Sequence, residues 1–413
     1  MTAYVPNPVV TFNNTTTYAD NTIADISINI GRGDVIEATQ AGYARIVLWT
    51  PADTPLTISL SDIVTVSIDK GTTGTATIFT GIVSDIDLSL ANYGDIGSIA
   101  EYSLTAVGPL AQLNKRIAGS TGYPKQKDGD RVFAILSEAF LTQWDDIAPT
   151  TTWNDIPNGV AWDNYDGVNE EIVANLATTI DRPGQYELTA YSDGPDNALD
   201  LINDAAQSGR GVIFEAGNGH LHYGDYASRV SAPIVNLTAD DLLTDGLQSS
   251  AQWSEIVNDV TVTYKANAEK FARSEASVTL YGQLAGTRET TLENATDAQN
   301  QANDFLASRA FPRVYPESLS VALHNPNMTD AKRDALIAAE NGTAITTSSL
   351  PKVFGITFEG YLEGYTWRLT RYEAYLDLIC SAQSETYSSI IWYQLPPDGT
   401  WAAYNPTKRW NEL

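Results

Sequence analysis

The sequence has few of the residues that form covalent or metal cross-links. Cys380 is the only cysteine in 413 residues, so no disulfide can form within one chain. The three histidines, His220, His222 and His324, leave little material for a zinc site, which takes four ligands in its structural form. We therefore expect packing, rather than cross-links, to stabilise the fold.

Positive charge and long apolar runs are also scarce. Lys and Arg number 24 against 51 Asp and Glu, which gives a formal net charge of −27. Such a chain repels phosphates, so nucleic-acid binding as the main activity and docking to anionic lipid are both disfavoured, and solubility explains the charge equally well. No stretch approaches the ~18 apolar residues of a membrane span, and the N-terminus lacks a basic segment followed by an apolar one. We expect a protein made in the cytoplasm, without membrane insertion.

The length and apolar content indicate a folded protein of several domains. A chain of 413 residues is long enough for two or three domains rather than one. Apolar residues make up 43% of it, too much for a disordered acidic chain, because their burial offsets the entropy lost on folding.

The first quarter of the chain alternates apolar and polar residues, which is the pattern of half-buried strands. The predicted strands are Ile23–Ile30, Tyr43–Thr50, Leu56–Leu60, Val64–Ile68, Ile78–Leu90 and Ala100–Val107. Gly81 stands where a bulge or bend would be tolerated. Six short strands in succession predict a small β-barrel or sandwich over residues 1–108.

After Gly108 the period changes to that of helices. The predicted elements are the helices Asp130–Leu141 and Asp196–Ser208 and the strands Val212–Glu215 and His220–Tyr223. Asp130 is the expected cap of the first helix, and Asp193 or Asp196 that of the second. An Asn-Gly pair between the two strands predicts a hairpin. We therefore expect an α+β middle region over residues 109–250.

The β pattern returns in residues 251–413 and predicts a second β-barrel. The predicted strands are Val257–Tyr264, Ser277–Tyr281, Ser318–Leu323, Val353–Phe358, Tyr361–Thr370 and Tyr372–Ser381, interrupted by one helix, Thr296–Arg309. The C-terminal tail is aromatic, with Trp401 and Trp410, and we expect it to pack against other structure. The fold class is mainly β, with two small barrels separated by the helix-and-hairpin region.

Residue patterns that would indicate a catalyst or a metal site are weak. His220 and His222 share one face of a strand near Asp225, but a metal would need further ligands, so half-exposed strand residues are the favoured interpretation. The turn Gly31–Asp34 is better explained as a connection between strands than as a binding loop. Carboxylates are too numerous for a glycosidase pair to be identified. We assign no catalytic, cofactor-binding or metal residues and expect no enzyme.

The loop around residues 144–171 leaves several interpretations open. Its acidic run, residues 162–171, could hold Ca²⁺ through oxygen ligands, but it does not fit EF-hand spacing, which favours a solvated loop. Trp144, Trp153 and Trp162 could stack on sugars, although large aromatics in β proteins more often belong to a core or an interface. Whether this loop contacts an ion, a sugar or a partner, or acts as a plug, stays open.

A short internal echo links the two β regions. Phe79-Thr-Gly81 and Phe358-Glu-Gly360 both read Phe-X-Gly followed by two large apolar residues. Each is followed by another alternating strand, and each lies late in its β region. The echo predicts that the two barrels are structurally equivalent.

The order of segments resembles the minor tail proteins of long-tailed bacteriophages. The segments that carry the resemblance are Ile28–Asp34, Ala41–Leu48, Phe79–Asp87, Tyr102–Ala111, Asn197–Ile202, Gly209–Leu221, Ile256–Val262, Tyr361–Trp367 and Trp401–Asn405, with Trp410. They span nearly the whole chain, although each is degenerate by itself.

Within that family the two-barrel layout is similar to the tail hub. The resemblance implies a homotrimer in which each subunit contributes two equivalent barrels, so that three subunits present six to a six-fold tube. The implied function is assembly: a ring at the tail tip of the virion that joins the tube and distal tail ring to the tip, holds the tape-measure protein and opens for DNA. The acidity would then let DNA slide through the lumen without specific binding.

Three alternatives compete with a hub. A distal tail ring subunit would form a hexamer, and a receptor-binding protein would stand at the tip. A carbohydrate-binding or carbohydrate-cleaving protein would use the Trp- and Tyr-rich loops.

Overall fold

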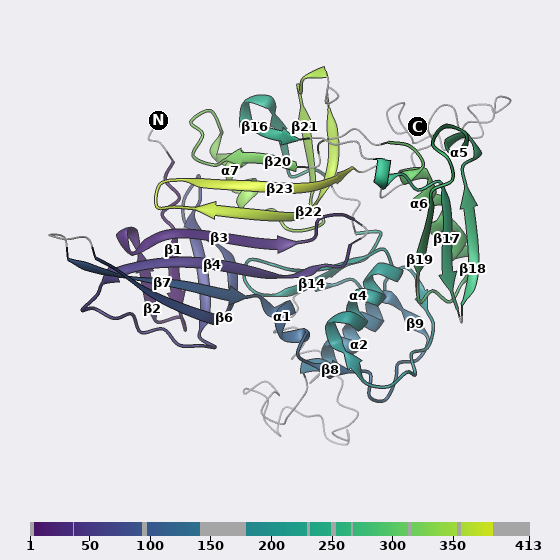
Figure 1. The fold of residues 1–413 in the computed structure, drawn as a ribbon, viewed down its shortest axis with the longest axis horizontal. Helices are drawn as coiled ribbons and strands as arrows, with labels where there is room; N and C mark the ends of the chain where they lie inside the picture. Colours follow the sequence, from purple (N-terminus) through teal and green to yellow (C-terminus); the bar gives the residue numbers. More distant parts are fainter. Residues whose placement is uncertain are drawn as a thin grey trace.

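One large, mostly antiparallel sheet of thirteen strands dominates the computed structural model (Figure 1). The model describes residues 4–35, 37–92, 97–140, 179–228, 232–248, 253–265, 267–312, 316, 318–352 and 357–382. The strands of this sheet are β1 (Val9–Phe12), β2 (Thr16–Ala19), β3 (Ile23–Gly31), β4 (Gln40–Pro51), β5 (Ile63–Asp69), β6 (Thr75–Asn92), β7 (Ser98–Val107), β15 (Val235–Thr238), β16 (Leu242–Gln248), β20 (Ser318–Ala322), β21 (Ala344–Ser348), β22 (Phe358–Leu369) and β23 (Ala374–Ala382). The fold is mainly β, as the alternating pattern predicts.

The sheet consists of two halves that repeat one strand order. In the first half, the short helix η1 (Asp20–Thr22) leads into β3, and neighbouring strands follow the order β3-β4-β7-β6-β5. In the second half, η5 (Ala239–Asp241) leads into β16, and the order is β16-β20-β23-β22-β21. Counted along the chain, each half places its first, second, fifth, fourth and third strands side by side.

The Phe-X-Gly echo occupies the same place in both halves. Gly81 pairs with a residue of β5, and Gly360 pairs with a residue of β21. The ring of Phe79 lies against Gly81, and the ring of Phe358 lies against Gly360, so closely that a Cβ atom on either glycine would collide with it. The predicted correspondence between these two segments is confirmed.

A β-bulge follows the echo in both halves. The pairing of β6 with β7 shifts after Val83, and the pairing of β22 with β23 shifts after Leu362. Ser84 and Glu363 are therefore the extra residues of two equivalent bulges. The halves thus match in strand order and in the bulge that follows the Phe-X-Gly segment.

Both halves share one hydrophobic core, built from the alternate residues of their strands. In β3, the side chains of Ile26, Ile28 and Ile30 are buried, and the intervening residues face outward. Fully burying such a side chain stabilises a fold by about 1.5–3 kcal/mol. Because β22 pairs with β3 over Gly364–Leu369, this core continues from one half into the other.

A second core lies in the middle of the chain. It joins the helices α1 (Pro109–Leu113), α2 (Asp128–Phe140), α4 (Ala198–Ser208) and α6 (Ala295–Arg309), the hairpin β13 (Val212–Glu215) and β14 (Leu221–Gly224), and the sheet of β17 (Asp259–Tyr264), β18 (Ala268–Arg273) and β19 (Ala285–Glu289). The short strands β8 (Ile117–Ala118), β9 (Gln126–Lys127), β10 (Thr179–Ile180), β11 (Glu187–Leu188) and β12 (Asp196–Asn197) pair around it. The predicted helices and the hairpin of this region are confirmed.

The predicted pair of small barrels is not confirmed. None of the sheets among the described residues closes on itself, because the edge of β22 bonds to β3 of the other half and makes one open sheet. The strands of residues 251–413 are divided between this sheet and the β17–β19 sheet. The domain boundaries after residues 108 and 250 stay predictions.

Several local predictions were wrong. Leu56–Leu60 forms no strand, and Ser277–Tyr281 belongs to the helix α5 (Glu275–Tyr281). A further helix, α7 (Asp330–Ile337), was not predicted. Helix α2 begins two residues before Asp130, and Asn197, rather than a neighbouring aspartate, caps α4 by accepting two backbone N–H bonds.

Most of Val353–Phe358 and the whole tail after residue 382 lie outside the described residues. No helix in the described part of the chain is long and apolar enough to cross a bilayer.

Candidate assembly interface

The outer face of the large sheet is a continuous surface that spans both halves and mixes charged and hydroxyl side chains with the exposed rings of Tyr43 and Trp49. Its residues alternate with the core residues of β6, β7, β4, β3, β22 and β23, and cross-strand pairing aligns them in rows. One row reads Asp85, Thr105, Arg45, Ser27, Arg368 and Tyr375. A neighbouring row reads Val107, Tyr43, Asn29, Thr366 and Asp377.

Acidic groups outnumber basic ones on this outer face. The carboxylates on it are those of Asp25, Asp85, Asp87, Glu101 and Asp377, and the guanidinium groups are those of Arg45 and Arg368. Arg368 is already paired with Asp377 at 2.9 Å. The face therefore carries net negative charge, which repels a phosphate backbone.

A buried ion pair fastens the two halves where β22 meets β3. The Arg32 guanidinium donates from Nε to Glu363 Oε2 at 2.8 Å, and its Nη2 lies 2.8 Å from the same oxygen as part of the ion pair. The backbone N–H of Arg32 donates to the Glu363 carbonyl at 3.0 Å. Ser381 donates to the other carboxylate oxygen. Both charged side chains are almost fully buried. Glu363 is the bulged residue of β22, so the bulge aims its side chain at the first half.

Gly31 makes this joint possible. Its φ is +104°, a conformation that L side chains rarely adopt, and a Cβ atom there would collide with the Glu363 carbonyl. Asp34, a few residues further on, accepts two bonds from Arg309 at 2.7 and 2.8 Å. The segment Gly31–Asp34 is thus a connection between strands, as predicted, and it also ties the first half to β22 and to α6.

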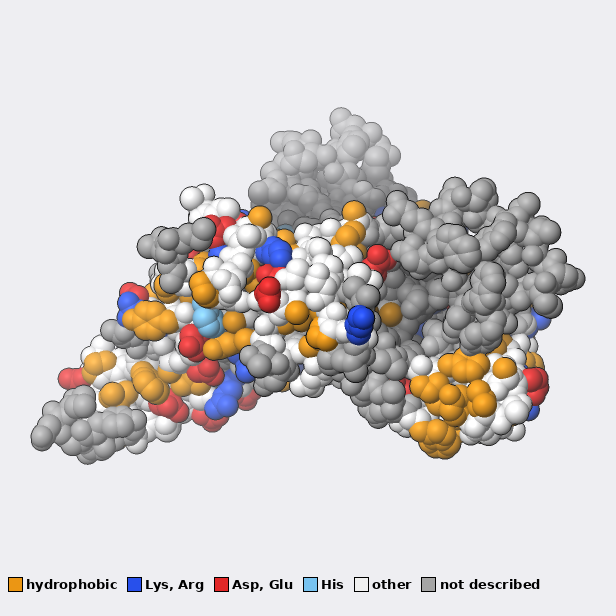
Figure 2. Space-filling view, turned by 90° about the horizontal axis from the view of Figure 1, so that it is seen from above, with side chains coloured by type: hydrophobic (Ala, Val, Ile, Leu, Met, Phe, Trp, Pro, Cys, Tyr) orange, Lys and Arg blue, Asp and Glu red, His pale blue; other side chains and the backbone are white. Residues whose placement is uncertain are grey.

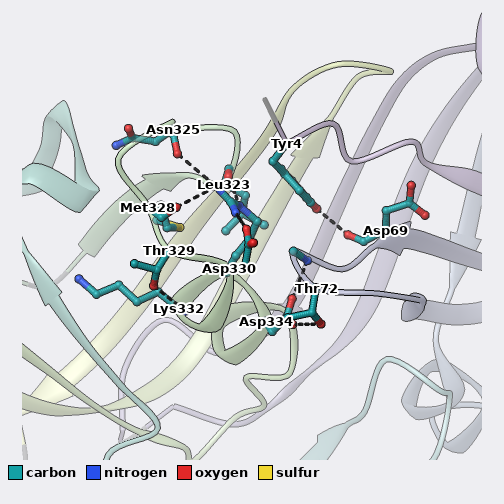
Figure 3. Close-up of polar contacts among 12 residues, drawn as sticks. Tyr4, Asp69, Thr72, Leu323, Asn325, Met328, Thr329, Asp330, Lys332 and Asp334 are labelled. Atoms are coloured by element: carbon teal, nitrogen blue, oxygen red, sulfur yellow. Dashed lines mark hydrogen bonds and ion pairs between the residues drawn. The ribbon is translucent and has the colours of Figure 1, made fainter. Parts of the chain in front are cut away.

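Helix α7 forms a second fastening between the halves, shown in Figure 3. Its Asp334 carboxylate accepts the backbone N–H of Gly71 and the hydroxyl of Thr72, both at 2.6 Å, from the β5–β6 turn of the first half. Thr329 caps the helix by accepting the N–H of Lys332. The second half therefore contacts the first half away from the β22–β3 joint as well.

Arg333 is the buried centre of this second fastening. Its guanidinium donates to the carbonyls of Leu323 at 2.6 Å and Met328 at 3.1 Å. It also lies 4.5 Å above the ring of Tyr4, whose hydroxyl donates to the carbonyl of Asp69 at 2.7 Å (Figure 3). The cation thus fixes the loop before α7 and contacts a residue from the start of the first half.

Glu215 docks the middle region onto the first half. Its buried carboxylate accepts the N–H groups of Gly42 at 2.9 Å and Leu110 at 2.6 Å. Gly42 and Gly108 lack the Cβ atoms that would collide with it. Burial raises the pKa of Glu215 to about 7, and the two backbone hydrogen bonds only partly oppose this rise.

The predicted histidine and cysteine candidates serve packing. His222 stacks on Phe214 at 5.3 Å, and burial, followed by the charge of His220, lowers the pKa of His222. His324 Nδ1 accepts the N–H of Ala374 at 3.3 Å. Burial raises the pKa of the Cys380 thiol. Among the described residues, no group of three or more His, Cys, Asp or Glu side chains is placed to hold a metal ion.

The remaining predicted candidates lie outside the described residues. They are the acidic run 162–171 and Trp144, Trp153, Trp162, Trp401 and Trp410. The two fastenings between the halves were not foreseen. Their residues are 331 positions apart in one case and more than 260 in the other, and no local signal connects them.

The fold of the chain is similar to that of solved phage tail proteins. A tail protein from Neisseria meningitidis matches with a TM-score of 0.61 and 14% identity, covering 92% of this chain and 98% of that one. A 43 kDa tail protein of the prophage MuSo2 from Shewanella oneidensis matches with a TM-score of 0.60 and 11% identity, covering 92% and 99%. A prophage tail protein from Listeria monocytogenes matches with a TM-score of 0.50 and 11% identity, covering 92% and 95%.

These matches define the fold over nearly the whole chain. The predicted resemblance to phage tail proteins is confirmed at that level. Comparison of the sequence alone identifies no family, since no family model and no curated protein matches.

Proposed function

We propose that this chain is a structural subunit of a phage tail tip: a hub that assembles as a homotrimer and presents six similar β modules. The observation that carries the proposal is the repetition of strand order and bulge in the two halves. A duplicated module is of use where a three-fold assembly meets a six-fold tube, because three chains then supply six equivalent surfaces. The tail-protein fold supports the same role.

The hub joins the tail tube and its distal ring to the tip, and its ring encloses the path of the DNA. The outer face of the large sheet is the surface we assign to the lumen, because it is continuous across both halves and net acidic. On the face that Figure 2 shows, acidic and basic side chains are interspersed among the described residues, without an extended basic patch. DNA would pass such a wall without binding it. Partners in the tail are the distal tail protein and the tape-measure protein.

The mass of the purified assembly tests this function. Native mass spectrometry of the full chain is expected to give three copies. Six copies per assembly would favour a distal tail ring subunit instead, and a monomer would contradict both ring-forming functions. Binding of the monomer to a glycan array would then test the carbohydrate-binding alternative.

A further inference from the structure

A cavity lies where the two halves and the middle region meet. Its volume is about 590 Å³, within the range of about 300–1,000 Å³ that small-molecule sites occupy. The β5–β6 turn and the start of β6 line it from the first half, α7 and β22 from the second half, and the turn of the β13–β14 hairpin from the middle region. The exposed residues Lys70, Thr72 and Thr73 belong to the lining, so the cavity opens to solvent beside the β5–β6 turn.

Hydrogen bonds between these parts of the chain hold the walls of the cavity in place. Asp334 fastens α7 to Gly71 and Thr72 of the β5–β6 turn (Figure 3). The Thr80 hydroxyl donates to the carbonyl of Gly217 at 3.0 Å, which fastens the hairpin turn to β6. The cavity is therefore formed before any ligand arrives, and binding does not require its walls to become ordered.

A buried tyrosine in the wall of the cavity has a hydroxyl without a partner among the described residues. Tyr365 and Trp367 line the cavity from β22, and they are only 5% and 2% exposed. The hydroxyl of Tyr365 forms no hydrogen bond with a described residue, and its oxygen is not sealed from solvent. Buried polar groups of proteins are nearly always hydrogen-bonded, so this hydroxyl is placed to bind a ligand in the cavity.

Glu340 adds a carboxylate that lacks a cation. It follows α7 in the lining, is half-buried, and its side chain forms no hydrogen bond or ion pair with a described residue. Burial raises the pKa of Glu340, and no neighbouring cation opposes this rise. Burial, followed by the charges of Glu340 and Glu215, also raises the pKa of the Tyr365 hydroxyl. Lys70, the only cationic residue of the lining, is exposed and forms no ion pair with a described residue, so the negative charge of the cavity is left uncompensated.

We propose that this cavity binds a primary alkylammonium ion. The ammonium group has three N–H donors, so it can bind the carboxylate of Glu340 and the hydroxyl of Tyr365 together. The alkyl chain packs against Trp367, and aromatic walls favour organic cations. A neutral ligand would leave the carboxylate unpaired, and the charges of Glu340 and Asp334 repel an anion. A free amine and the side chain of a lysine share this chemistry. The site lies within one chain, so it does not depend on the number of copies in the proposed hub.

Isothermal titration calorimetry of the full chain with butylammonium chloride tests the site. The wild type is expected to bind one ion per chain, and butanol, a neutral molecule of similar shape, to bind about tenfold more weakly or not at all. Glu340→Gln should weaken butylammonium binding about tenfold or more, and Tyr365→Phe about fivefold. The matched control is Glu359→Gln, which removes the same charge from an exposed position of β22 and should bind as the wild type does.

Thermal unfolding separates ligand binding from a structural role of Glu340. Without butylammonium, Glu340→Gln should unfold at or above the wild-type midpoint, because it loses no partner and no longer buries a charge. Butylammonium should raise the midpoint of the wild type and of Glu359→Gln, but not that of Glu340→Gln.

The source of the ammonium group is read with a second probe, Nα-acetyl-lysine N-methylamide. Binding of both probes would assign the site to a lysine side chain, and binding of butylammonium alone to a free amine. Either result supports the cation site. No saturable binding of butylammonium, butanol binding as tightly, or equal binding by the wild type and Glu340→Gln would overturn it. None of these results bears on the number of copies, which tests the proposed function separately.

Discussion

The two halves of the large sheet share a plan but differ in what their strands do beyond it. The hairpin of β6 and β7 extends past the bulge as a long arm with exposed leucines (Figure 1). The equivalent hairpin of β22 and β23 is shorter there, ending at Leu369; its edge pairs with β3, and its inward side chains, Trp367 and Leu369, are buried in the core. The shared part is what the proposed hub would need to present equivalent modules, and the different part distinguishes one half of each chain from the other.

The bulge residues show the same contrast at a single position. Ser84 makes only local hydrogen bonds, to Asp85 and to the carbonyl of Thr105. Glu363, at the equivalent place, reaches into the other half and binds Arg32. A duplicated module has thus acquired a fastening to its neighbour at one of its two bulges. Four experiments, each with one or two substitutions, measure how far the likeness and the difference extend.

The largest effect is expected at the joint between the halves. Glu363→Gln removes one charge of the buried pair and deprives the buried Arg32 guanidinium of the Glu363 carboxylate, which costs about 3–5 kcal/mol in the free energy of unfolding. Asp377→Asn is the matched control, since its partner Arg368 is half-exposed and such pairs contribute about 0–1 kcal/mol. Urea denaturation measures both. Equal losses in the two variants would show that the joint is no stronger than a surface pair.

The next largest effect is a loss of unfolding free energy that depends on pH. It concerns the contact with the first half, onto which Glu215 docks the middle region. Its pKa is raised to about 7 in the folded protein, so the folded state binds the proton more tightly than the unfolded state. Its contribution to stability is therefore complete below about pH 4.5 and is lost as the pH rises through 7, by about 3 kcal/mol.

Glu215→Gln tests this dependence. The variant cannot titrate, so the difference in unfolding free energy between wild type and variant should change across pH 4.5–7 and stay constant above it. Differential scanning calorimetry at several pH values measures it. A difference that does not depend on pH would contradict the raised pKa.

The likeness of the halves is tested by matched glycine substitutions. Gly81→Ala and Gly360→Ala each push a Cβ atom into a phenylalanine ring and a neighbouring carbonyl, so both are expected to destabilise by about 1–3 kcal/mol. Ser89→Ala on the outer face is the control, with an expected change within about 0.5 kcal/mol. If one glycine tolerated alanine and the other did not, the two bulged segments would not be equivalent.

The smallest effect on stability is expected from charge reversal on the outer face. Asp85→Lys with Asp87→Lys should change the unfolding free energy by less than about 0.5 kcal/mol. The same variant should acquire DNA binding that weakens as salt rises, which fluorescence anisotropy with a labelled duplex measures. Asp53→Lys, in an exposed turn away from this face, should acquire none. DNA binding by the control alone would place the lumen elsewhere.

Much of the fold could be predicted from the sequence where local pattern and tertiary structure agree. The alternation in β3 and β5 and the helical spacing in α2 and α4 predicted those elements to within two residues. Leu56–Leu60 alternates in the same way but forms no strand. The hydroxyls of Tyr102 and Tyr18, rather than a neighbouring strand, accept the N–H groups of Leu56 and Thr57. Alternation of apolar and polar residues indicates which side chains are buried, but it does not indicate whether a neighbouring strand pairs with the backbone.

Tertiary context also overrode propensity in Ser277–Tyr281. Its β-branched residues favour a strand, but Ser274 caps a helix there by accepting the N–H of Ser277. The Ser277 hydroxyl is buried and donates to the carbonyl of Ala310. Those partners are set by the packing of α6, which no local window contains.

The candidate interface was predictable only in its symmetry. The echo at Phe79 and Phe358 located two equivalent strands, because a phenylalanine ring packed over a glycine two residues on leaves a local signature. The Arg32–Glu363 pair and the contacts of Asp334 leave none, since each joins residues that meet only after both halves have folded. The sequence likewise did not show that the halves would merge into one sheet instead of closing separately.

A three-dimensional reconstruction of the purified full-length assembly by electron cryomicroscopy tests the central claim most directly. The account predicts three chains around one axis, with the two halves of each chain superposing on each other at equal radius to give six modules. A monomer, six chains, or two halves at different radii would contradict it.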